Sequence, residues 1–227
     1  MNDEVEKLRH GFRPAQVTVL FIGESAPPGG KTFFYSGDSN LYRAMREAFN
    51  GGDEFLPEFT SKGYFLDDLV LFPADKITEK EQGQFLAECR RDRYTDNIRS
   101  LSARIIAYRP QGIVLLLSGR GFDKAVLKAL EEANAGLTDT KVQHYGTAPF
   151  PNRYHYRQFL EEMSRIIPKL PILQQRGPVP HADNHIDPLH AIERALALLH
   201  SVQALEGTDK DSVEHLLDVA LQKLRGE

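Results

Sequence analysis

The stretch QVTVLFIG at residues 16–23 predicts the centre of the fold. Its side chains are almost all apolar and it ends in a glycine, which is typical of a parallel strand that is buried on both faces. A second stretch of the same kind, GIVLLLSG, occupies residues 112–119. Because both faces of such strands must be covered, we expect helices on either side of one sheet.

Two further segments predict shorter strands. YFLDDLVLFP at 64–73 favours a strand but carries two acids in its middle, and TKVQHYGTAPFP at 140–151 runs from a strand into a loop. The fold class predicted is α/β, a three-layer α/β/α sandwich with a central, mainly parallel four-stranded sheet, and its ligands belong at the carboxyl ends of the strands. Helices are expected at 41–49 with Ser39 or Asp38 as the cap, at 79–108 with a break, at 121–133 and at 154–167.

The chain changes character after this region. Five prolines lie between residues 168 and 188, and two amphipathic segments follow. We predict an α/β domain at 1–170, a proline-rich linker at 171–187 and a helical hairpin at 188–227. The hairpin is expected to dock on the core or on a second subunit, which would make the protein a homo-oligomer.

Composition excludes several classes of protein. The net charge of −4 over 227 residues argues against bulk-charge binding to nucleic acid, although a local basic patch stays open. The single cysteine, Cys89, excludes internal disulfides and multi-cysteine metal sites. Because no apolar run reaches about 18 residues and the N-terminus has no apolar signal core, we expect a soluble cytoplasmic protein without a membrane partner.

Two motifs suggest ligands and are rejected on geometry. GGKT at 29–32 lacks the first glycine of a phosphate-binding loop, because position 25 is Ser25, and Pro27 and Pro28 remove backbone donors. HADNHIDPLH at 181–190 holds three histidines and two aspartates, but a proline-flanked loop does not place them on one helix face. Neither a metal nor a cofactor is therefore expected.

The stretch IGESAPPGGKTFFYSGDSN at 22–40 resembles the first motif of the uracil-DNA glycosylase superfamily. The superfamily's third strand and helix are similar to residues 109–130, RPQGIVLLLSGRGFDKAVLKAL. Pro73 resembles the proline that ends its second strand. Its second catalytic motif would correspond to residues 148–163, APFPNRYHYRQFLEEM. This resemblance covers residues 14–168. It implies hydrolysis of the N-glycosidic bond of a deaminated or damaged base, such as uracil, during DNA repair, without a cofactor and with single- or double-stranded DNA as partner.

The resemblance assigns roles to residues of the first motif. Glu24 would be a catalytic carboxylate that stabilises the positive charge of an oxocarbenium-like sugar and positions water. Phe34 would stack on the flipped base, with Phe33 or Tyr35 as substitutes, and Ser25 would contact the base. The structural alternatives are a Glu24 that caps a helix or pairs with an arginine, and a Phe34 that packs in the core.

The base-reading position departs from the superfamily pattern. Uracil-excising members have asparagine six residues before the second-strand proline, and counting back from Pro73 gives Asp67. An ionised aspartate accepts hydrogen bonds but does not donate them, so it does not match uracil. Either a protonated Asp67, which burial would favour, or a base that offers more donors would restore the match. Asp68 is the alternative, since successive side chains of a strand face opposite sides.

The second motif departs as well. Phe150 stands at its catalytic position, where a phenyl ring offers no hydrogen bond, so Asn152 is the candidate to replace it, with His144 and His155 as alternatives. Arg153 and Arg157 would grip DNA phosphate, or else be solvated charges at a helix start.

These departures leave rival functions open. A glycosylase-like scaffold that binds nucleic acid or a nucleotide without cutting it is suggested by Phe150, Asp67 and the negative net charge. An unrelated small-molecule hydrolase on the same fold is the third hypothesis.

Overall fold

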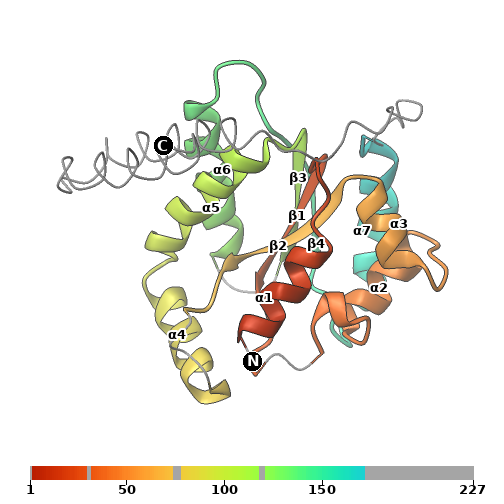
Figure 1. The fold of residues 1–227 in the computed structure, drawn as a ribbon, viewed down its shortest axis with the longest axis horizontal. Helices are drawn as coiled ribbons and strands as arrows, with labels where there is room; N and C mark the ends of the chain where they lie inside the picture. Colours follow the sequence, from red (N-terminus) through yellow and green to blue (C-terminus); the bar gives the residue numbers. More distant parts are fainter. Residues whose placement is uncertain (1, 30–31, 74–77, 118–120, 172–227) are drawn as a thin grey trace, which may run out of the picture. The chain divides into compact units, whose positions relative to one another are not determined.

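The structure is a computed structural model that describes residues 2–29, 32–73, 78–117 and 121–171 (Figure 1). The predicted hairpin at 188–227, the histidine-rich segment at 181–190 and nearly all of the predicted linker lie outside the described residues. Among the helices described, none is long and apolar enough to cross a membrane.

Four strands form one sheet in which every neighbouring pair is parallel. The sheet has the order β2-β1-β3-β4, with β1 and β3 in the centre. This confirms the predicted fold class, with a sheet that is wholly rather than mainly parallel. The bounds are Val19–Ser25 for β1, Tyr64–Val70 for β2, Gly112–Leu117 for β3 and Gln143–Pro149 for β4.

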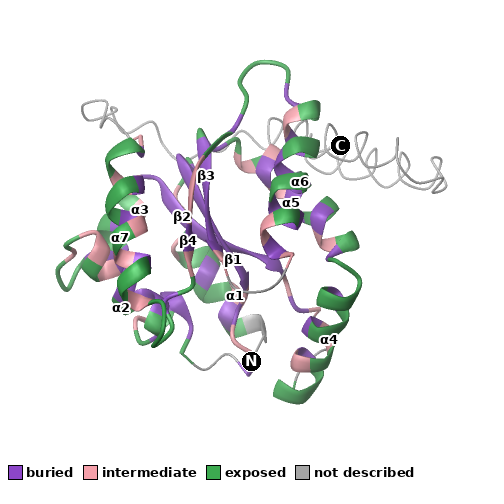
Figure 2. Cartoon of the chain, turned by 180° about the vertical axis from the view of Figure 1, so that it is seen from behind, coloured by how far each residue is buried: buried purple, intermediate pink, exposed green. Residues whose placement is uncertain are grey.

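Helices cover both faces of the sheet, as Figures 1 and 2 show from opposite sides. One layer holds α4, α5 and α6, and the other holds α2, α3 and α7. β1, β2 and β3 are buried almost throughout and carry the apolar core on both faces, whereas the edge strand β4 begins with exposed residues. The bounds are Asn40–Ala48 for α2, Phe55–Ser61 for α3, Glu79–Arg91 for α4, Thr95–Tyr108 for α5, Phe122–Gly136 for α6 and Tyr156–Ile166 for α7, with short 3-10 turns at Phe34–Ser36 (η1) and Ile167–Lys169 (η2).

Local signals set several helix ends. Ser39 caps α2 by accepting a hydrogen bond from the backbone N–H of Tyr42, and Thr78 forms a capping box with Glu81 at the start of α4. The predicted break within 79–108 falls at Arg93 and Tyr94, which both adopt the left-handed conformation. This break separates α4 from α5 and turns the side chain of Tyr94 inward.

The sequence analysis did not predict α1 (Asn2–Gly11) or α3. In the structure, Arg9 of α1 forms buried ion pairs with two acids of the edge strand β2. The hydroxyl of Tyr35, in η1, donates to the carbonyl oxygen of Leu66 and accepts from its N–H, at 3.0 and 2.7 Å. The free edge of β2 is thus covered by a helix and a tyrosine, which protects its unpaired backbone groups.

Candidate functional site

The topology points to the carboxyl edge of the sheet as the functional region. From β1 the chain continues to β2 on one side, and after β2 it crosses over to β3 on the other side of β1. The direction in which strands are added to the sheet therefore reverses between β1 and β3. Ligands of open α/β sheets bind outside the strand ends at such a point. Glu24 and Ser25 end β1 here, and the backbone N–H of Phe150 donates to the carbonyl oxygen of Leu117 at the end of β3, at 2.6 Å.

A buried carboxylate, that of Glu24, accepts hydrogen bonds from Arg90 and Tyr94 at this edge. Arg90 of α4 donates from Nε and Nη2 to the two oxygens of Glu24, each at 2.7 Å. The hydroxyl of Tyr94 donates to Oε1 of Glu24, also at 2.7 Å. Glu24 is 4% exposed, so the carboxylate is oriented by these donors rather than by water. The arginine-paired alternative for Glu24 is therefore what the structure contains.

Arg90 and Tyr94, which both donate to Glu24, keep their protons over the physiological pH range. The hydrogen bond from Arg90 to Glu24 raises the pKa of the guanidinium despite partial burial. Burial and the hydrogen bond to Glu24 raise the pKa of the Tyr94 hydroxyl. A charged arginine and a neutral tyrosine both stabilise an ionised carboxylate, because each donates to it.

Strand alternation divides the predicted site residues between the two faces of the sheet. The register places Ile22 beside Asp67 and Gly23 beside Asp68. Glu24 and Asp67 therefore face the layer of α4 and α5, while Ser25 faces the layer of α2 and α3. Phe34 also packs in the latter layer, against Phe59 at a ring-centroid distance of 5.7 Å. The structure therefore brings Glu24 and Asp67 to one face of the sheet and does not place Ser25 and Phe34 with them.

Asp67 is fully engaged by two arginines. Its Oδ1 accepts from Arg9 at 2.7 Å and from the backbone N–H of Asp68 at 2.8 Å, and its Oδ2 accepts from Arg104. Burial by itself raises the pKa of Asp67, but the positive charges of Arg104 and Arg9 outweigh it and hold the pKa below its usual value. The expectation of a protonated Asp67 that contacts a base is thus corrected, because its carboxylate is ionised and already bound.

The pKa of Asp68 is shifted in the opposite direction from that of Asp67, although Arg9 also binds Asp68. Arg9 donates from Nη2 to Oδ2 of Asp68 at 2.7 Å. Burial raises the pKa of Asp68 more than the charge of Arg9 lowers it. Arg9 therefore reaches around the edge of β2 and joins carboxylates from its two faces, which is a structural role rather than a base-reading one.

Phe34 has no face open to a ligand. It is 3% exposed, and four aromatic rings surround it. The core-packing alternative describes this ring in the present arrangement, because a stacking platform needs an exposed face. The neighbouring rings are those of Tyr35, Tyr42, Phe55 and Phe59. Phe33 and Tyr35, the substitutes, are equally buried at 2% exposure.

The segment after β4 is exposed and contains the residues of the second motif. Phe150 is 36% exposed. Oδ1 of Asn152 accepts from the backbone N–H groups of Tyr154 and His155, at 2.8 and 3.1 Å. This carboxamide oxygen shapes the turn that begins α7. Nε2 of His144 lies 3.0 Å from the carbonyl oxygen of Gly146, so this histidine also makes a local contact.

The two predicted DNA-binding arginines are at the surface. The guanidinium of Arg153 lies over the ring of Tyr154, 4.4 Å from its centroid. Arg157 is 93% exposed as a side chain and pairs with Glu161 one turn along α7, at 3.2 Å. Both are accessible to a phosphate, and both are also ordinary solvated charges at the start of a helix.

Sequence reasoning missed Arg9, Arg90, Tyr94 and Arg104. Arg90 and Arg104 lie in the predicted helix at 79–108, and basic residues of a helix are ordinarily expected to face solvent. The signal available was the presence of Glu24, Asp67 and Asp68 in strands that are otherwise apolar, because buried carboxylates require partners. The presence of these acids predicts that cationic side chains lie beside them in the fold, but it does not identify those side chains.

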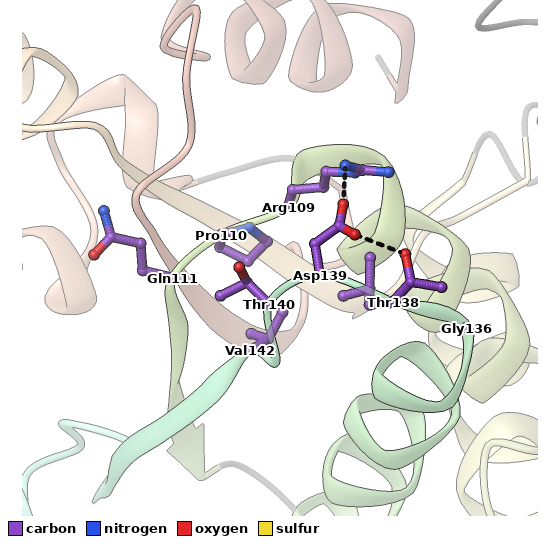
Figure 3. A pocket seen from close by; sticks show the side chains of 9 residues that line it. Arg109, Pro110, Gln111, Gly136, Thr138, Asp139, Thr140 and Val142 are labelled. Atoms are coloured by element: carbon purple, nitrogen blue, oxygen red, sulfur yellow. Dashed lines mark hydrogen bonds and ion pairs between the residues drawn. The ribbon is translucent and has the colours of Figure 1, made fainter.

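A cavity of about 310 Å³ lies at the opposite, amino edge of the sheet (Figure 3). Arg109 and Asp139 form an ion pair at its mouth, with 3.9 Å between Nη1 and Oδ2. Oγ1 of Thr138 donates to Asp139 at 2.9 Å. The cavity lies before the first residues of β3 and β4, away from Glu24, so it is separate from the candidate site.

The chain matches no protein-family model, no curated protein and no solved structure in the comparisons made. Within the described ranges, no group of three or more histidine, cysteine, aspartate or glutamate side chains is placed to hold a metal ion.

Proposed function

We propose that the carboxyl edge of the sheet hydrolyses the N-glycosidic bond of a deaminated or damaged base, uracil or a related one, in DNA. The observation that carries this proposal is the buried carboxylate of Glu24, which Arg90 and Tyr94 orient at 2.7 Å at the end of a central strand. The resemblance of residues 22–40 to the first glycosylase motif supports the same role for this position.

The chemistry needs a fixed negative charge beside the sugar. Cleavage of an N-glycosidic bond passes through an oxocarbenium-like sugar, and a preorganised carboxylate stabilises that charge without reorganising during the reaction. Arg90 and Tyr94 donate to Glu24, which favours the ionised form that this role needs.

Base recognition is assigned to the segment after β4. Because Asp67 is bound by arginines and Phe34 is closed, neither supplies the base contacts expected of it. Phe150 has a partly exposed ring and is tied to the end of β3 by its backbone N–H. We assign stacking to Phe150, and we assign a contact with the leaving base to the carboxamide of Asn152.

The test is an excision assay on labelled single- and double-stranded oligonucleotides bearing uracil, hypoxanthine, xanthine or a mismatched thymine. The wild type should form abasic sites on at least one of them, and Glu24→Gln should lower the rate by about 100-fold or more, as expected for loss of a preorganised charge. The matched control is Glu162→Gln, because Glu162 forms a surface ion pair with Arg165 on α7 and should leave the rate unchanged.

A second candidate is a scaffold that binds nucleic acid or a nucleotide without cutting it. The closed ring of Phe34 and the phenyl side chain at position 150 favour it. The two candidates separate in one experiment, in which binding of the same oligonucleotides is followed by fluorescence anisotropy. Salt-sensitive binding without abasic sites would replace the hydrolase by the scaffold.

A further inference from the structure

Arg90 is bound to a buried carboxylate and is also exposed to solvent. Its side chain is 48% exposed, whereas the side chain of Glu24, to which it is bound, is 3% exposed. Arg104 makes a comparable pair with Asp67 on the same face of the sheet, but its side chain is only 16% exposed. Arg90 is therefore a carboxylate-bound arginine of this face whose side chain is also about half exposed to solvent.

The pair with Glu24 uses only part of the hydrogen-bonding capacity of Arg90. A guanidinium has five N–H donors in a planar fork. The hydrogen bonds to Glu24 come from Nε and Nη2, so Nη1 is not among the nitrogens bound to the carboxylate. Because Glu24 is buried and holds two nitrogens, the plane of the guanidinium is fixed before any ligand arrives, and less side-chain entropy is lost on binding.

We propose that Arg90 binds a phosphate group of the ligand through the part of its guanidinium that Glu24 leaves free. The inference rests on the proposed function, since it places this phosphate beside the carboxylate assigned to catalysis. Guanidinium groups bind phosphate through paired, charge-assisted hydrogen bonds. The hydrogen bond to Glu24 raises the pKa of Arg90, so the guanidinium stays positively charged at neutral pH.

One residue then sets the distance between phosphate and catalytic carboxylate. Arg90 touches Glu24 with two of its nitrogens, so a phosphate on the same guanidinium would have a defined position relative to Glu24. The sugar that lies between the phosphate and the base would be held near the carboxylate. The phosphate could be a diester of a nucleic-acid strand or the monoester of a free nucleotide, and the chemistry at Arg90 is shared by both.

The test observes the arginine side chains of the intact protein labelled with nitrogen-15 arginine, by nuclear magnetic resonance. The probes are deoxyuridine, deoxyuridine monophosphate and an oligonucleotide without terminal phosphates. We expect the Nε–H signal of Arg90, assigned with the Arg90→Lys variant, to shift with a phosphate-bearing probe and not with deoxyuridine. The internal control is Arg165, a carboxylate-paired arginine on the surface of α7.

The outcomes separate the sources and the hypotheses. A shift with the oligonucleotide supports a strand phosphate, and a shift with the mononucleotide alone supports a free nucleotide. No shift of Arg90 with either probe, or an equal shift of Arg165, overturns the inference. Arg90→Lys should weaken phosphate-dependent binding about tenfold, because lysine does not reproduce the planar fork. Excision without a shift would overturn this inference alone, whereas a shift without excision would overturn only the proposed hydrolysis.

Discussion

The carboxylate of Asp68 lies directly over Gly23 of the neighbouring strand. A Cβ atom at position 23 would stand 2.5 Å from Oδ1 of Asp68. The acid is not free to swing away, because its Oδ2 is bound to Arg9 at 2.7 Å. The glycine that precedes Glu24 is therefore required by a buried acid on the adjacent strand.

Gly23→Ala should destabilise the protein. The added methyl group forces Asp68 away from its position and strains its ion pair with Arg9, and overpacking of this kind costs about 1–3 kcal/mol. The free energy of unfolding from urea denaturation measures the effect. The control is Gly83→Ala in α4, where a Cβ meets nothing within 4 Å and should stabilise the helix by about 0.5–1 kcal/mol. Equal effects of the two substitutions would contradict the packing described for Gly23.

Asp67→Asn should destabilise the protein in a pH-dependent way. The pKa of Asp67 is lowered in the folded state by Arg104 and Arg9, so its ionised form stabilises the fold. This contribution is present above the usual pKa of aspartate and is lost as the pH falls through the folded pKa. We expect a loss of about 3–5 kcal/mol at neutral pH and a smaller loss in acid.

Urea denaturation of Asp67→Asn and of the wild type at neutral and at acidic pH measures this difference. The charge of Asp67 also helps to raise the pKa of Asp68, so the same comparison made in an Asp68→Asn background isolates the contribution of Asp67. A loss of stability that is the same at both pH values would mean that Asp67 is not ionised in the folded protein.

Tyr94→Phe should weaken the site without removing the arginine pair. The substitution deletes the hydroxyl that donates to Glu24 at 2.7 Å and keeps the ring, so we expect a loss of about 1–3 kcal/mol of folding free energy. If Glu24 is the catalytic carboxylate, the excision kcat should also fall about tenfold while KM stays near that of the wild type.

A matched control for Tyr94→Phe exists on the surface. Tyr156 donates to Glu47 at 2.7 Å in an exposed pair, so Tyr156→Phe removes a similar hydrogen bond away from the carboxyl edge of β1. We expect a small effect on stability and none on kcat. A comparable drop in kcat in both variants would contradict a specific role for Tyr94.

Arg109→Gly should stabilise the protein. Arg109 ends α5 in the left-handed conformation, with φ 46°, where glycine is favoured at helix ends. Its ion pair with Asp139 is exposed and 3.9 Å long, so losing it costs little. We expect a gain of about 0.5–1 kcal/mol in thermal or urea unfolding, and no gain for Arg109→Ala, which retains a Cβ. A gain with alanine would show that side-chain repulsion, rather than the backbone, is being relieved.

The fold could largely be predicted from local patterns. The apolar run at 16–23 overlaps β1 and the run at 112–119 contains β3. The helix signals at Ser39 and at 79–108 correspond to α2 and to α4 with α5. These patterns are read over a few neighbouring residues, and burial on both faces leaves a continuous apolar run. The helix α1 was missed because its contact with β2 is made by residues far apart in the sequence. Arg9 is separated from Asp67 by 58 positions and from Asp68 by 59.

The candidate site was predicted only in part. The sequence by itself determined that Glu24 ends a central strand and that acids occupy the middle of β2, because both follow from the strand pattern. Only the tertiary structure decided their partners, since the pair of Glu24 and Arg90 spans 66 positions. It also decided which of them share a face, because the register of β1 and β2 places Asp67 beside Ile22 and Asp68 beside Gly23. Whether an acid reads a base or holds a helix depends on which cation lies within hydrogen-bonding distance, and that distance is a property of the packed fold.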